Sequence, residues 1–182
     1  LGRGEGRHAV RGLAPDGRSY LVYDKVHGYA LMDMATGAPI GRDVRGVYNP
    51  TGDRVIAEGD DVITKMTLWD AHTGKQLAPI QPLAPVRNFH FSADGTRMLT
   101  AHASGLRQVW DIQEVRLVQT IRALADRGDP DEVGSAALSP DGRRALLIDK
   151  GAAPGVWDVD RGEVLARLEG TTERVGEAPL SG

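Results

Sequence analysis

The side chains of this 182-residue chain that could do chemistry include five histidines, and their spacing decides whether they can hold a metal. They are His8, His27, His72, His90 and His102. None pairs with another at i, i+2 on a strand or at i, i+4 on a helix, so the sequence predicts no histidine metal site. Cysteine is absent, which excludes disulfides, Cys-ligated zinc and a thiol nucleophile.

Serine and aspartate occur at positions that repeat, and repetition argues against a catalytic centre that exists once. No G-x-S-x-G sequence is present. Ser92, Ser139 and Ser181 each occupy the same place in a recurring turn, which is typical of side chains that hydrogen-bond to the turn backbone. A set of aspartates recurs in the same way, at Asp33, Asp70, Asp111 and Asp158. We therefore predict no catalytic residue, no cofactor and no metal, and a protein that is not an enzyme.

Two motifs recur in register and define the element that carries these residues. The first is a turn that ends in glycine, at residues 14–17, 49–52, 92–95 and 139–142. The second is a strand end 16 to 18 residues after that glycine, at Met32-Asp33, Trp69-Asp70, Trp110-Asp111 and Trp157-Asp158. Short runs rich in Val, Ile, Phe and Trp lie between these turns. Each unit is thus expected to be a four-stranded antiparallel meander, with the tryptophans in its core.

The residues S-P-D-G-R at 139–143 and V-W-D-V at 156–159 carry a family resemblance. With their three counterparts they make the chain similar to the WD-repeat family of β-propellers, from about His8 to the C-terminus. The spacing of the units is close to the roughly 40 to 45 residues of a propeller blade. The resemblance implies an all-β fold, a β-propeller of four-stranded antiparallel blades, and surfaces on which other proteins dock.

The sequence departs from the family pattern in two ways. The Gly-His pair that usually precedes the first strand is absent. The turn aspartate of the family is also replaced in every unit, by Val26, Ile63, Ser104 and Gly151. The hydrogen-bond chain of His, Ser/Thr, Trp and Asp that ties family blades together is therefore not expected here, and packing should hold the blades.

The repeats divide the chain into a flexible lead at 1–7, four blades and the start of a fifth at 171–182. The expected blades are about 8–43, 44–82, 83–125 and 133–170, with a long connector at 122–132. Four blades in an open arc leave two apolar faces uncovered. A four-bladed ring, a second copy of the chain or further blades of the same chain could cover them, and the fifth first strand favours a piece of a longer propeller.

Charge and composition exclude several kinds of partner. The net charge is −3, so no strong field attracts nucleic acid or an acidic membrane. Aromatic residues make up 5% of the chain, and no basic patch interleaves with them, so a base-stacking surface is not expected. No apolar run approaches the roughly 18 residues of a membrane span, and no leader-like segment opens the chain. We expect a cytoplasmic protein that binds neither nucleic acid nor membrane.

One rim of the blades is the expected binding surface. In a meander, the turn between the second and third strands shares a rim with the connectors between blades. The repeat is lengthened at these places, and the added segments are acidic. We predict that this rim docks a basic segment of a partner protein; the alternative is a set of solvated acidic loops. The predicted rim residues are Asp60, Asp61, His102, Asp126, Asp129, Asp131, Glu132 and Lys150.

The function expected from the sequence is therefore a non-enzymatic interaction or scaffold module. The alternative is the propeller part of an enzyme, lactonase-like or peptidase-associated, whose catalytic groups lie elsewhere. No constellation that occurs only once in the sequence supports that alternative.

Overall fold

The computed structural model describes residues 9–24, 28–58, 65–102, 105–122, 135–148 and 153–168. Within these ranges the chain forms sixteen strands and no helix. The strands make four separate four-stranded sheets, each an antiparallel meander of consecutive strands. This confirms the all-β class and the propeller blades expected from the repeats.

The four sheets are named blade 1 to blade 4 in chain order. Blade 1 consists of β1 (Ala9–Leu13), β2 (Ser19–Asp24), β3 (Gly28–Asp33) and β4 (Pro39–Arg42). Blade 2 consists of β5 (Gly46–Tyr48), β6 (Arg54–Glu58), β7 (Met66–Asp70) and β8 (Gln76–Ile80). Blade 3 consists of β9 (Val86–Phe91), β10 (Arg97–His102), β11 (Leu106–Asp111) and β12 (Arg116–Arg122). Blade 4 consists of β13 (Ser135–Leu138), β14 (Arg144–Ile148), β15 (Gly155–Asp158) and β16 (Glu163–Arg167).

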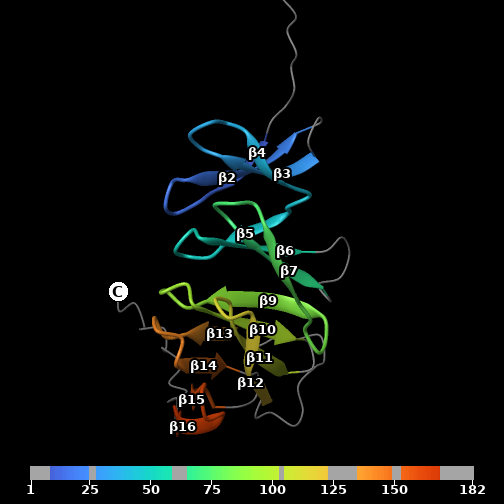
Figure 1. Cartoon of the computed structure of the whole chain (residues 1–182). Coiled ribbons are helices and arrows are strands. Elements are labelled where there is room, and N and C mark those ends of the chain that lie inside the picture. Colours follow the sequence, from blue (N-terminus) through green and yellow to red (C-terminus); the bar gives the residue numbers. More distant parts are fainter. Residues whose placement is uncertain are drawn as a thin grey trace, which may run out of the picture.

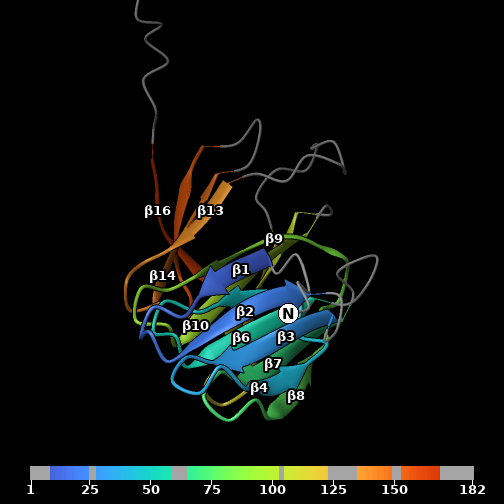
Figure 2. The same ribbon diagram turned by 90° about the horizontal axis from the view of Figure 1, so that it is seen from above.

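The blades are stacked in sequence order, with blade 1 and blade 4 at opposite ends (Figure 1). Seen from above, β13 and β16 run across the direction of the blade 1 strands, so the stack turns from one end to the other (Figure 2). The sheets do not close into a ring. The molecule is a partial propeller with two end faces.

The recurring turns contain the side-chain hydrogen bonds that their sequence indicates. Ser139 Oγ donates to Asp141 Oδ1 at 2.6 Å, and the backbone nitrogen of Arg143 donates to the same oxygen at 3.1 Å. Ser92 and Asp94 form the same pair at 2.6 Å. Ser92 and Ser139 are therefore turn residues, as predicted. Ser181 lies outside the described residues.

The aspartates at the ends of the third strands also shape turns. Asp70 Oδ1 accepts hydrogen bonds from the backbone nitrogens of His72 and Thr73, at 3.0 and 2.8 Å. Backbone nitrogens of the following turn make the same kind of bond to the equivalent carboxylates, those of Asp33, Asp111 and Asp158. Each carboxylate thereby satisfies backbone donors of the turn to the fourth strand.

A β-bulge precedes the tryptophan position in every blade. The pairing of third and fourth strands shifts between Leu68 and Trp69, between Val109 and Trp110, and at the equivalent places in blades 1 and 4. A bulge increases local twist. The same irregularity in all four blades gives the outer strands a common twist.

Among the described residues, three layers of the hydrophobic core lie between neighbouring blades, and a smaller fourth cluster of Val22, Ala30 and Met32 lies within blade 1. Trp110 is only 8% exposed and packs with Ile56 and Leu68 of blade 2, which confirms its place in the core. Leu99 and Val109, on the opposite face of blade 3, pack against blade 4. Because side chains alternate between the faces of a strand, the tryptophan face of each blade looks toward the preceding blade.

Candidate docking surfaces at the two rims

Seven of the eight predicted rim residues lie outside the described residues. These are Asp60, Asp61, Asp126, Asp129, Asp131, Glu132 and Lys150. The eighth, His102, is the last residue of β10 and is 0% exposed. The prediction that His102 contributes to an exposed docking rim was therefore wrong, because its side chain points into the molecule.

His102 instead ends a chain of buried hydrogen bonds in blade 3. Its Nδ1 lies 2.8 Å from the carbonyl oxygen of Ala84, and its Nε2 lies 3.1 Å from Thr100 Oγ1. Trp110 Nε1 donates to the same hydroxyl at 3.2 Å. A carbonyl can only accept, so Nδ1 carries the proton and Nε2 accepts from Thr100. Burial lowers the pKa of His102, which favours this neutral form.

The described bonds of this network join a histidine, a threonine and a tryptophan but no aspartate, so blade 3 has part of the four-membered chain that was not expected from the sequence. The histidine of this network is His102, the last residue of β10, and its Nδ1 contacts the loop ahead of β9. Only blade 3 has the central hydroxyl, since the residues equivalent to Thr100 are Val22, Ala57 and Leu147. Accordingly, the buried Nε1 atoms of Trp69 and Trp157 have no hydrogen-bond partner among the described residues.

The rim that carries the glycine turns is called here the turn rim. Side chains on this rim form hydrogen bonds and ion pairs between neighbouring blades. His72 Nε2 of blade 2 lies 2.6 Å from Asp16 Oδ2 of blade 1. Arg54 Nη2 of blade 2 donates to Gln113 Oε1 of blade 3 at 2.9 Å. The next interface pairs Arg97 of blade 3 with Asp160 of blade 4 at 2.7 Å. His72 thus has a carboxylate partner in the neighbouring blade. These contacts were missed because they join turns of different blades, although His72, Gln113 and Asp160 share one repeat position.

The opposite rim, called here the connector rim, has a hollow of about 440 Å³ between blades 1 and 2. It is lined by Arg11, Leu21, Tyr29, Val44, Arg45 and Gly46. The Arg45 guanidinium lies 5.7 Å from the centre of the Tyr29 ring. Neither Arg11 nor Arg45 forms an ion pair with any residue in the described ranges. No sequence motif points to this hollow, because its residues come from β1, β2, β3, β5 and the connector that leads to β5.

Neither rim presents a metal-binding cluster among the residues that the structure describes. No group of three or more His, Asp or Glu side chains there is placed to hold a metal ion. The same ranges contain no helix long and apolar enough to cross a membrane.

Comparisons with known proteins show which proteins this chain resembles. No protein-family model matches the sequence. The WD repeat-containing protein VIP3 of Arabidopsis thaliana is 27% identical over 150 residues, which are 77% of this chain and 46% of that protein. An uncharacterized WD repeat-containing protein of Deinococcus radiodurans is 26% identical, over 90% of this chain and 73% of its own length.

Two further matches concern larger proteins. Autophagy-related protein 16 of Arabidopsis thaliana is 26% identical over 60% of this chain, so the chain spans less than half of this relative and of VIP3. Among solved structures, Kuenenia stuttgartiensis hydrazine synthase superposes with a TM-score of 0.56 at 17% identity, over 85% of this chain and 46% of that one. That likeness is one of fold alone. From its four-stranded blades and these relatives, the chain is a partial β-propeller similar to the WD-repeat family.

Proposed function

We propose that this chain is a non-enzymatic docking module that receives a partner protein on its connector rim. The observation that carries the proposal is the hollow between blades 1 and 2, where two arginines have no ion-pair partner in the described ranges. On the turn rim, by contrast, the side chains of His72, Arg54 and Arg97 are bonded to neighbouring blades.

The hollow is suited to an acidic side chain of a partner. Arg45 is held over the Tyr29 ring, and Arg11 lines the same 440 Å³ space from β1. A guanidinium presents paired donors that match a carboxylate. Leu21 and Val44 add apolar lining, which excludes water around such a pair.

We place the acidic turns predicted from the sequence on the same rim, because in a meander the connectors and the turns between second and third strands share one rim. They carry Asp60, Asp61, Asp129, Asp131 and Glu132, which lie outside the described residues. Together with the hollow, they make a rim of mixed charge. Such a rim favours a protein segment that carries basic residues with a nearby carboxylate, and it disfavours a uniformly charged polyanion.

The test measures binding of two labelled decapeptides to the full chain, one rich in glutamate and one rich in lysine, by fluorescence anisotropy at several salt concentrations. The Arg11→Gln/Arg45→Gln variant should lose the acidic peptide, and Asp129→Asn/Asp131→Asn/Glu132→Gln should lose the basic one. Arg18→Gln on the turn rim is the matched control and should bind as the parent does. If neither peptide binds, or if all variants bind alike, the proposal fails.

A further inference from the structure

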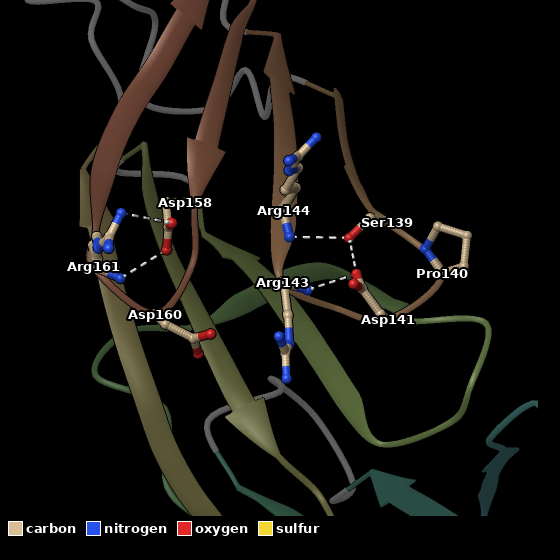
Figure 3. Close-up of a pocket in the computed structure, with 8 residues that line it drawn as sticks. All are labelled: Ser139, Pro140, Asp141, Arg143, Arg144, Asp158, Asp160 and Arg161. Atoms are coloured by element: carbon tan, nitrogen blue, oxygen red, sulfur yellow. Dashed lines mark hydrogen bonds and ion pairs between the residues drawn. The ribbon is translucent and has the colours of Figure 1, made fainter.

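The hollow between blades 1 and 2 differs in charge from the groove on the turn rim of blade 4. That groove, of about 730 Å³, is lined by three arginines and three aspartates (Figure 3). Within it Arg161 Nη1 lies 3.9 Å from Asp158 Oδ2. The described residues that line the hollow include two arginines, Arg11 and Arg45, and no carboxylate. The groove is therefore balanced in charge, whereas the two positive charges of the hollow have no counter-charge in its lining.

The backbone on both sides of Arg45 is fixed. The N–H of Val44 donates to the carbonyl oxygen of Tyr29 at 3.3 Å, and the Val44 side chain is 1% exposed. A Cβ atom added to Gly46 would overlap the carbonyl of Ile56, so the chain can approach β6 here only because this residue is glycine. Arg45 thus enters the hollow from a connector that is held in place before and after it.

The side chain of Arg45 is also ordered in the absence of a ligand. Its guanidinium lies 5.7 Å from the centre of the Tyr29 ring, and that ring contacts Tyr23 with 4.8 Å between the two ring centres. Asp43 has a φ of 58°, a conformation that is uncommon outside glycine and that clusters at ligand clamps. A side chain that is already held in place loses less conformational entropy when it binds. Arg45 is therefore preorganised to bind an anion.

A phosphate monoester matches this hollow better than a carboxylate does. It carries a charge of about −1.5 to −2 at pH 7 and three strong acceptor oxygens, whereas a carboxylate carries a single charge on two oxygens. Arg11 lines the hollow from β1 and Arg45 from the connector between β4 and β5, so the two guanidiniums can bond to different oxygens of a tetrahedral group. The volume of about 440 Å³ also exceeds the needs of a carboxylate, since it equals the share of roughly fifteen waters in the liquid.

We propose that the hollow binds a phosphoserine of a partner protein, with Arg11 and Arg45 bonded to the phosphate oxygens. The proposal rests on the function proposed above, which assigns the hollow to an acidic side chain of a partner, and it names that side chain. A free phosphate ion would leave most of the 440 Å³ to water. A phosphoserine in a peptide fills more of this volume, because its own backbone and the neighbouring residues enter the mouth of the hollow.

The test uses three labelled decapeptides of one sequence, with phosphoserine, glutamate or serine at the central position. Their binding to the full chain is measured by fluorescence anisotropy. The phosphoserine peptide should bind at least about ten times more tightly than the glutamate peptide, and the serine peptide should bind most weakly. If glutamate binds as tightly as phosphoserine, the phosphate assignment is wrong while the proposed function stands. If neither binds, both fail. Inorganic phosphate that competes at the same concentration as the phosphopeptide would overturn the assignment to a partner protein.

Two variants separate the geometry of the hollow from its charge. Arg11→Lys/Arg45→Lys keeps both positive charges but removes the paired donors, so it should lose most of the preference for phosphoserine over glutamate. Arg42→Gln is the matched control, because Arg42 is an exposed arginine at the end of β4 that does not line the hollow. It should bind all three peptides as the parent does. A preference that survives the lysine substitutions, or an equal loss in Arg42→Gln, would overturn the proposal.

Discussion

Removing one hydroxyl from the core of blade 3 tests the hydrogen-bond chain most directly. Thr100→Val keeps the size and branching of the side chain but leaves two buried groups unpaired, Trp110 Nε1 and His102 Nε2. Thr100 and His102 are both 0% exposed, so water cannot replace the lost bonds without rearrangement. An unsatisfied buried group costs about 1–3 kcal/mol. With two such groups, we expect a loss of about 2–6 kcal/mol in the free energy of unfolding.

The assay is urea unfolding followed by tryptophan fluorescence, analysed by linear extrapolation. Thr120→Val is the matched control, because Thr120 is a half-buried strand residue whose hydroxyl makes no hydrogen bond in the described ranges; its change should stay within about 0.5 kcal/mol. In a double-mutant cycle, Trp110→Phe should cost less in the Thr100→Val background than in the parent, since the indole donor is then already unpaired. If Thr100→Val costs no more than Thr120→Val, the hydroxyl does not hold the blade together and the reasoning is refuted.

Three further changes test other parts of the structure. The pKa of His102 is lowered in the folded state, so the unfolded chain binds the proton more readily; stability should be full above pH 6.5 and should fall as the pH drops below it. His102→Gln should flatten that fall in the urea midpoint between pH 7 and pH 5, and an unchanged slope would contradict the assignment. Gly74→Ala should destabilise far more than Gly37→Ala although both residues have φ of 66°, because a Cβ at Gly74 would overlap the Ile40 carbonyl while Gly37 has open space; equal melting temperatures would count against the close approach of the blades. Trp110→Ala should cost roughly 3–5 kcal/mol in the same urea assay, and an unchanged midpoint would place Trp110 outside the core.

The repeats made the blades predictable because each unit carries its own turn and strand-end signals. Asp94-Gly95 and Trp110-Asp111 mark one unit without reference to any other, and the alternation of Phe89 and Phe91 sets a strand face, seen in their ring contact at 5.8 Å. Such features depend on residues near each other in the sequence. The sequence alone is therefore sufficient to recognise them.

Contacts between distant segments were not predictable in the same way. His102 was placed on a rim because a turn follows it, but the Ala84 carbonyl that binds it lies in a loop 18 residues earlier. Arg11 and Arg45 are unremarkable in the sequence, and the hollow that they share exists only once blades 1 and 2 are stacked. The bulges before the tryptophans likewise carry no residue signal, since Leu68, Val109 and Val156 precede them as ordinary strand residues.

The turn-rim bonds have a consequence for how such a chain can lengthen during evolution. Each bond joins one blade to its immediate neighbour. It runs from the residue two positions after a strand-end aspartate to the glycine turn of the preceding blade, or to the arginine that follows that turn. A blade copied by tandem duplication inherits both halves of this interface at once. The duplicate can therefore bond to its parent and to the next blade without any compensating mutation, so gain or loss of whole blades should be tolerated more readily than insertion within one.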